Sequence, residues 1–281
     1  MFVGVNGCPR GWFAVAFPKL GEPAFGVFQH VEELWRKYHD AELICIDIPI
    51  GLRRAEGLGD APASPGLRRG EGLGDALASP GLREGGLRRG EDDERERACD
   101  LRARELLGDR ASSVFPAPCR EAAYAPTYKK ACDINERLTG KRISKQTWAI
   151  VPRIRELDEL LRRDERARAC FREVHPELCF WAFAGGRPMT HHKSTEQGYL
   201  ERANLLEHVH PRAYDIIAEA LDAFPRSAVA RDDILDALAA AVTALAGPNA
   251  LATLPKNPGT DPESLPMQMV YSPQFLEYEW P

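Results

Sequence analysis

The sequence lacks a long hydrophobic run, a paired-cysteine motif and an excess of positive charge. No stretch of about 18 apolar residues occurs, so we expect no membrane-spanning helix. The seven cysteines are scattered without a C-x-x-C pair, which argues against a zinc ribbon or a thioredoxin-like site and fits reduced thiols. The net charge of −5, from 37 Lys and Arg against 42 Asp and Glu, excludes a general positive coat for nucleic acid.

The first residues also lack the features of an export signal. The segment MFVGVNGCPRGW contains neither a basic region nor an apolar core of signal-peptide length. We therefore expect a cytoplasmic protein that does not associate with a membrane. The chain has 281 residues, of which 44% are hydrophobic and 28% are charged, as in an ordinary globular protein. We expect a single domain over residues 1–281.

A tandem repeat interrupts this domain. The segment GLRRAEGLGDAPASP, residues 51–65, is followed by GLRRGEGLGDALASP, residues 66–80, and then by a decaying copy. A period of about 15 residues is shorter than a usual solenoid unit, and each copy offers only its leucines for burial. Glycine, proline, serine and alternating charge favour disorder. The repeats therefore predict a flexible, low-complexity insertion over residues 52–97.

Short β-favouring runs separated by glycine and proline turns open the chain. These runs are residues 2–6, 12–17 and 25–29. Apolar residues then recur at helical spacing from Val31 to Tyr38. The continuous apolar run from Leu43 to Ile48 is typical of a central parallel strand that is buried on both faces. Within this run we expect Cys45 to be a core residue.

Helical patterns dominate the chain after the insertion. Helices are predicted over residues 98–107, 151–169, 199–209 and 212–224, and from Asp232 to a stop at Gly247. A strand ends at His175 and Pro176 opens a short helix, whereas residues 110–126 are expected to be irregular and residues 267–272 to form a strand at a sheet edge. The order β-β-β-α-β-α-β-α predicts an α/β fold with a mixed five-stranded sheet, flanked by helices and carrying extra helices.

One acidic residue is predicted at the end of the central strand. Asp47 has only apolar neighbours, including Ile46 and Ile48, so its carboxylate is costly unless it reaches solvent, a cation or hydrogen bonds. A structural alternative is that Asp47 caps the turn at Pro49. We favour a functional role, because a carboxylate held among apolar residues is typical of a site.

Further acids lie in helices. Asp233 and Asp236 are three residues apart and so share one helical face, although Asp232 and Asp233 would also suit the positive end of a helix dipole. Glu177 has the same two interpretations, because it follows Pro176 in the first turn of a helix. Oxygen ligands from a strand end and a helix face are what Mg²⁺ or Mn²⁺ prefers. The pattern indicates metal-dependent hydrolysis of a phosphodiester.

Several segments outside the insertion together resemble the family DUF 429, which is described as predicted nucleases with a ribonuclease H-like fold. The segments are GVNGCPRGW, CIDIPIGL, CDLRARELLG, SSVFPAP, SKQTWAIVPRIRELD, EVHPELCF and DDILDALAAA. The resemblance covers nearly the whole chain except about residues 52–97. It implies a ribonuclease H-like fold and a nuclease activity.

The resemblance also implies a set of site residues. In that superfold, the site takes acids from the first strand, the fourth strand and the last helix, and the D-x-x-D face of the last helix resembles that of Holliday-junction resolvases. The acids of the fourth strand and last helix correspond to Asp47, Asp233 and Asp236, and Glu177 matches the His-Pro-Glu element of the family. The family usually reads G-V-D-G-C where this chain has Asn6. An amide donates an oxygen but no charge, so metal affinity and water activation are expected to weaken.

Our first hypothesis is a metal-dependent nuclease or phosphodiesterase that uses Mg²⁺ or Mn²⁺. The expected metal ligands are Asp47, Asp233 and Asp236, with Asn6 and Glu177 completing the catalytic set and Lys145 and Lys193 contacting phosphate. DNA, RNA and a small phosphoester all fit this pattern. The alternative is a non-catalytic nucleic-acid-binding or scaffold protein that retains the fold, and Asn6 is the residue that separates the two hypotheses.

Other motifs carry less weight. The glycines of GVNGCPRG suit a hairpin turn better than a phosphate-binding loop. A nucleotide-dependent phosphotransferase would also need an adenosine pocket, for which the sequence gives no signal. The pairs His191-His192 and His208-x-His210 are expected to be surface histidines rather than zinc ligands. The basic stretch over residues 141–172 predicts either a solvated helix face or a local contact with a phosphate backbone.

Overall fold

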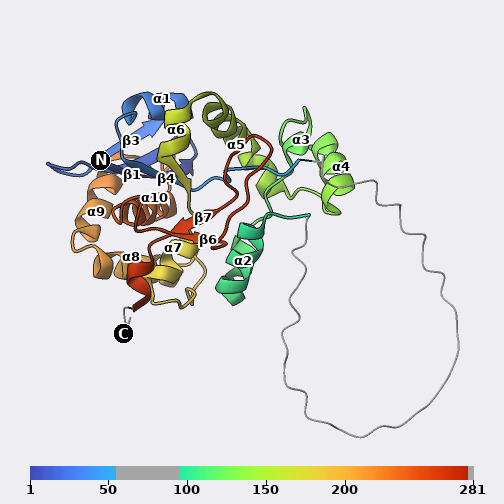
Figure 1. The fold of residues 1–281 in the computed structure, drawn as a ribbon. Coiled ribbons are helices and arrows are strands. Elements are labelled where there is room, and N and C mark those ends of the chain that lie inside the picture. The colour runs from blue at the N-terminus through green and yellow to red at the C-terminus, as the bar shows by residue number, and fades with distance from the viewer. Residues whose placement is uncertain (55–94, 278–281) are drawn as a thin grey trace, which may run out of the picture.

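The structure is a computed structural model that describes residues 1–54 and 95–277 (Figure 1). Residues 55–94, which contain all but the first four residues of the repeats and most of the predicted insertion, lie outside the described residues. A five-stranded sheet with the order β3-β2-β1-β4-β5 forms the centre of the fold. The strand β1 pairs antiparallel with β2 and parallel with β4, so the predicted mixed sheet flanked by helices is confirmed.

The elements follow one another along the chain in an α/β order. The strands of the main sheet are β1 (Phe2–Cys8), β2 (Gly11–Phe17), β3 (Ala24–Phe28), β4 (Leu43–Ile46) and β5 (Phe171–Glu173). The helices are α1 (Val31–Lys37), α2 (Ala98–Leu107), α3 (Arg120–Ala123), α4 (Tyr128–Thr139), α5 (Lys145–Arg163), α6 (Glu165–Cys170), α7 (Pro176–Phe183), α8 (Glu196–Val209), α9 (Ala213–Ala223) and α10 (Arg231–Ala244). Short 3-10 turns span Gly108–Ser113 and Pro273–Glu277. The strands β6 (Ala252–Leu254) and β7 (Met269–Tyr271) form a separate two-stranded sheet.

Helices cover both faces of the main sheet, as Figure 1 shows for α1 and α10. Successive side chains of a strand point to opposite faces. Leu43 and Cys45 of β4 therefore pack with the α7–α10 side, which confirms Cys45 as a core residue. Ile44 and Ile46 pack with α1 and α5 on the other face. A strand covered on both faces needs apolar residues throughout, which explains the unbroken run in β4.

The strand β1 and the helix α10 make the closest contact in the core. A Cβ atom placed on Gly4 would lie 2.0 Å from the backbone nitrogen of Ala241 and 2.2 Å from the carbonyl oxygen of Ala237. Real Cβ atoms do not approach other atoms this closely, so only glycine fits at position 4. The alanines on the facing side of α10 complete the contact, and the two backbones pack directly against each other.

A buried arginine holds together the two chain ends that flank residues 55–94. The Arg97 guanidinium donates to the carbonyl oxygen of Ile50 at 3.1 Å and to both carboxylate oxygens of Glu173 on β5 at 2.8 Å. Leu52, Glu96 and Arg97 are buried, so the outermost residues of the predicted insertion pack in the core. Burial raises the pKa of Glu173 to about 7, although Arg97 opposes this shift.

The predicted helix over residues 151–169 is in fact two helices. The first, α5, begins six residues earlier than predicted, because Ser144 Oγ accepts a hydrogen bond from the backbone nitrogen of Thr147 at 2.9 Å and caps its start. Pro152 therefore lies inside α5, where its side chain is exposed, and not in the first turn. Asp164 separates α5 from α6, because its carboxylate accepts from the backbone of Ala167 and from the Trp35 indole.

Two further expectations need correction. The segment 110–126 is not wholly irregular: it contains a 3-10 turn and α3, which packs with the unpredicted helix α4 around a small core of its own that includes Cys119 and Ala131. The final strand β7 lies within the predicted range 267–272, but it pairs with β6 and not with the edge of the main sheet. In the part of the chain that the structure describes, no helix has the length and apolar character needed to cross a membrane.

The contact at Gly4 yields a prediction about stability. We expect Gly4→Ala to destabilise the protein by about 1–3 kcal/mol or more, because the added methyl group would overlap the backbone of α10. Gly259→Ala is the matched control, since a Cβ there meets only the Met267 side chain at an ordinary 3.9 Å. Urea denaturation followed by circular dichroism measures both. Equal midpoints for the two variants would contradict the proposed contact.

Candidate functional site

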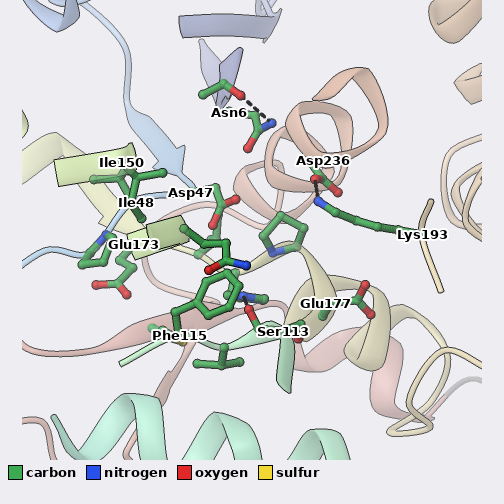
Figure 2. A pocket seen from close by; sticks show the side chains of 18 of the residues that line it. Asn6, Asp47, Ile48, Ser113, Phe115, Ile150, Glu173, Glu177, Lys193 and Asp236 are labelled. Carbon is green, nitrogen blue, oxygen red and sulfur yellow. Dashed lines mark hydrogen bonds and ion pairs between the residues drawn. The ribbon is translucent and has the colours of Figure 1, made fainter. Parts of the chain in front are cut away.

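A pocket of about 450 Å³ lies where β1 and β4 end and α10 begins. The five residues that the sequence predicted as catalytic all line it, and so does Lys193 (Figure 2). These five are Asn6, Asp47, Glu177, Asp233 and Asp236. Residues that are far apart in the chain therefore meet at the carboxyl ends of parallel strands, where α/β sheets commonly bind ligands.

The packing of β1 explains why these side chains meet. Gly4 and Asn6 are two residues apart in β1 and so lie on the same face of the sheet. Ala241, Ala237 and Asp233 follow one another at four-residue spacing along α10, with the two alanines beside Gly4. Two strand residues rise about 6.6 Å and four helix residues about 6 Å, so Asp233 arrives beside Asn6.

The pairing of β1 with β4 places the next acid. Val5 is paired with Ile46 in parallel register, and the backbone nitrogen of Asp47 donates to the carbonyl oxygen of Val5 at 3.0 Å. Asp47 therefore follows directly after the paired part of β4, next to Asn6 on the neighbouring strand. Figure 2 shows the Asp47 carboxylate in the middle of the pocket residues.

Asp47 is held at this position without a partner for its charge. None of the hydrogen bonds or ion pairs among the described residues involves its carboxylate. Burial raises the pKa of Asp47 to about 7, and the nearby Asp236 raises it further, whereas Lys193 lowers it. The Asp47 carboxyl group therefore lines the pocket with a raised pKa and without a hydrogen-bond or ion-pair partner among the described residues.

Asp233 has a structural contact as well as a place in the pocket. One oxygen accepts from the backbone nitrogen of Ala230 at 3.0 Å and caps the start of α10, as the dipole interpretation predicted. The other accepts from Nδ2 of Asn6 at 3.2 Å. Burial raises the pKa of Asp233 to about 6. The Asn6 amide thus satisfies Asp233 where a second carboxylate would repel it.

Asp236 is paired with Lys193. The Lys193 ammonium donates to Asp236 at 2.8 Å and lies 3.9 Å from Asp232. Asp236 raises the pKa of Lys193, so the lysine keeps its positive charge. In Figure 2 the Lys193 side chain extends toward Asp236 from the side that faces away from Asp47. Sequence reasoning assigned Lys193 to phosphate, and in the structure its first partner is a carboxylate.

The loop that carries Lys193 is fixed by α8. Glu201 accepts hydrogen bonds from the backbone nitrogens of Thr190 and His191, at 2.7 and 2.9 Å. Gly198 allows the close contact, because a Cβ there would lie 2.0 Å from the carbonyl oxygen of His192. The Lys193 ammonium is therefore held in place by the fold.

Glu177 lines the pocket but has its own counter-ions. Its carboxylate is buried at the start of α7 and accepts from the buried Arg202 guanidinium. Arg110 lies 3.6 Å from the same oxygen. The negative charge of Glu177 is therefore compensated, which sets it apart from Asp47.

The donor set suits a hard divalent cation but is not gathered around one point. All the predicted ligands supply oxygen, which Mg²⁺ and Mn²⁺ prefer. Within residues 1–54 and 95–277, however, no group of three or more His, Cys, Asp or Glu side chains is arranged as a metal site. Asn6 and Lys193 instead contact one oxygen each of Asp233 and Asp236. Because each carboxylate has about four lone-pair positions, both acids keep capacity for a metal ion.

Sequence reasoning missed part of the pocket wall. Phe115 and His175 line the pocket, whereas Lys145, which is exposed, does not, and its neighbour Gln146 does. Phe115 belongs to the segment SSVFPAP, which carries part of the resemblance to the family but no charged or metal-ligating residue. Burial lowers the pKa of His175, whose Nε2 lies 3.2 Å from the carbonyl oxygen of Ser113.

The glycines of the first hairpin are explained by packing. Gly11 has a φ of +125°, and a Cβ there would lie 2.2 Å from the carbonyl oxygen of Phe28. The guanidinium of Arg153 covers Gly7 and donates to the carbonyl oxygens of Cys8 and Gly11. The hairpin interpretation of this segment is therefore confirmed.

Some of the histidines and some residues of the basic stretch lie on the surface, and others line the pocket. His191 is exposed, as expected, and the exposed His192 reaches the pocket wall. Within the basic stretch, Arg153 lines the pocket, and several other arginines are used in internal contacts: Arg155 donates to the carbonyl oxygens of Ala123 and Ala125.

The fold and the site define an α/β protein with an acid-lined pocket at the carboxyl ends of its parallel strands. Residues 4–260 match the family model described as "Protein of unknown function (DUF429)". The chain therefore belongs to the DUF429 family, as its sequence motifs suggested. Neither the comparison with curated proteins nor the comparison with solved structures finds a match.

The raised pKa of Asp47 yields a prediction about pH. The pKa of Asp47 is about 7 in the folded protein and has an ordinary value of 3.8 in the unfolded chain. Between pH 3.8 and pH 7, the folded protein therefore keeps a proton on Asp47 that the unfolded chain releases. Without divalent ions, stability should therefore fall as pH rises through this range. We expect the wild type to lose about 2–4 kcal/mol relative to Asp47→Asn between about pH 4 and pH 8.

Denaturation midpoints over this pH range, in the presence of a chelator, measure the effect. Asp222→Asn, on the exposed side of α9 and outside the pocket, is the control and should follow the wild type. Parallel pH profiles for the wild type and Asp47→Asn would show that the pKa of Asp47 is not raised in the folded protein.

Proposed function

We propose that the protein is a metal-dependent phosphodiesterase or nuclease with a ribonuclease H-like fold. The observation that carries the proposal is the meeting of Asp47, from the end of β4, with Asp233 and Asp236, from one face of α10, in one pocket. The resemblance noted in the sequence implies acids from the same elements, the fourth strand and the last helix. The mixed sheet with β4 beside β1 supports this proposal.

Mg²⁺ or Mn²⁺ would be held by Asp47, Asp233 and Asp236, with Asp47 as the ligand that has no competing partner. A bound divalent ion activates water and stabilises the leaving oxygen of a phosphodiester. The side chains of Lys193 and Arg110 supply fixed positive charge on the wall of the same pocket, where they would orient a phosphate group. The expected substrates are DNA, RNA or a small phosphoester, and the cytoplasmic location stays a prediction from the sequence.

A second candidate function is nucleic-acid binding without catalysis. Two contacts favour it: the Asn6 amide and the Lys193 ammonium already compensate Asp233 and Asp236 in the absence of a metal ion. In this case the acids would be tolerated remnants of a site. Asn6 separates the candidates, because an aspartate at this position would create a carboxylate pair that only a cation relieves.

Asn6→Asp is therefore expected to destabilise the protein without divalent ions and to strengthen the binding of Mn²⁺ when the ion is present. Without divalent ions it should lower the melting temperature, since it replaces the hydrogen bond to Asp233 with repulsion. With Mn²⁺ it should bind the ion more tightly than the wild type by about tenfold, or about 1.4 kcal/mol, and cleave a phosphodiester faster. Calorimetric titration with Mn²⁺ and cleavage of a labelled oligonucleotide measure the two effects.

Matched variants make this test specific. Asp236→Asn should weaken both Mn²⁺ binding and cleavage, whereas Asp222→Asn outside the pocket should change neither. Mn²⁺ binding that is the same in the wild type, Asn6→Asp and Asp47→Ala would overturn the metal site. Nucleic-acid binding that persists without any metal effect would favour the second candidate.

A further inference from the structure

The pocket has an apolar side that the metal chemistry does not use. Ile48, Val114, Phe115 and Ile150 line it together with the acids. In the view of Figure 2, Phe115, Ile48 and Ile150 lie on one side of Asp47, and Lys193 and Asp236 lie on the other. Apolar side chains therefore gather on one side of Asp47, where the ion pair of Glu173 with Arg97 also lines the pocket, and the Lys193–Asp236 pair lies on the other side.

Phe115 is exposed although it is a large apolar residue. Its exposed fraction is 44%, and of the exposed large hydrophobic residues in the described part of the chain it alone lines the pocket. The others are Leu20, Tyr124, Leu200, Tyr214 and Leu245. An aromatic ring that stays accessible beside a charged site offers its face to a ligand.

The backbone on both sides of Phe115 is fixed. The carbonyl oxygen of Ser113 lies 3.2 Å from His175 Nε2, and that of Val114 accepts from Arg104 at 3.2 Å. The backbone nitrogen of Ala117 donates to Asp100 at 3.0 Å. The backbone that carries the ring is thus fixed before a ligand arrives, which lowers the entropy cost of binding.

We propose that Phe115, with Ile48 and Ile150, forms a stacking site for an unpaired nucleobase whose phosphate lies toward Asp47. The substrate is then a single-stranded nucleic acid, because the bases of a duplex are already covered by their neighbours. The volume of about 450 Å³ is within the range of pockets that take ligands the size of a nucleotide. This inference rests on the proposed function for the phosphate end and extends it to the class of substrate.

Binding without cleavage tests the base site directly. In a chelator, fluorescence anisotropy would compare the affinity of the protein for a labelled single strand, the same strand without bases, and the duplex. Stacking on an aromatic residue contributes about 1–3 kcal/mol per base, so the wild type should prefer the base-bearing strand to the abasic one by at least about fivefold. The duplex should bind no better than the abasic strand.

Substitutions at Phe115 then assign the preference. Phe115→Ala should remove it and leave abasic binding unchanged, Phe115→Trp should keep it, and Phe115→Leu should reduce it if the aromatic face is needed. Tyr214→Ala, at an exposed aromatic residue outside the pocket, should keep it. Thermal melting of each variant checks that the fold is retained.

The outcomes separate this inference from the proposed function. Equal binding of base-bearing and abasic strands by the wild type, or a preference that survives Phe115→Ala, would overturn the base site. If metal-dependent cleavage persists in that case, the proposed function stands alone. If the base preference is found and Asp47→Ala has no effect on metal binding, the base site is supported and the proposed function is not.

Discussion

The direct contact between the backbones of β1 and α10 is the constraint on which the pocket depends. A side chain at Gly4 would move α10 away from the sheet, and Asp233 and Asp236 would move with it. Because protein interiors are closely packed, such a shift cannot be absorbed locally. A backbone contact between glycine and alanine residues in the core thus sets the positions of the carboxylates that line the pocket.

Each fully buried acid of the described chain, inside the pocket or outside it, has a cationic partner. The pairs are Glu96 with Arg104, Asp100 and Glu173 with Arg97, Asp158 and Asp261 with Arg120, Glu177 with Arg202, and Asp236 with Lys193. A buried carboxylate without a cation is costly, so this pairing is what stability requires. Asp47 is only partly buried, but its carboxylate has a raised pKa and makes no hydrogen bond or ion pair among the described residues, and acids of this kind are concentrated at functional sites.

The sheet and the acids could be predicted because each has a local signal. An unbroken apolar run marks β4, and the cost of a carboxylate in that run marks Asp47. The partners of the acids have no such signal: Lys193 reaches Asp236 only because Glu201 on α8 fixes its loop. The start of α5 was missed for another reason, since Pro152 is typical of a first turn but is also tolerated on an exposed face when Ser144 caps the helix earlier.

The environment of Phe115 shows the same limit. Its segment has no regular periodicity, and its place beside the pocket depends on contacts with Arg104 and His175 that are distant in sequence or come from other elements. Sequence patterns indicate which residues are costly to bury. They do not indicate which exposed residues the fold will gather around one cavity.

The contacts of Arg97 have a consequence for how the chain can change in evolution. Arg97 joins Ile50 to Glu173, so the described chain on the two sides of residues 55–94 is fixed to the sheet and to itself. The contacts of Arg97 do not depend on how many residues the sequence places between Arg54 and Arg95, so a duplication of the kind recorded in the repeats can leave them unchanged. The junction is a place where the gene can gain or lose whole repeats while the pocket stays the same.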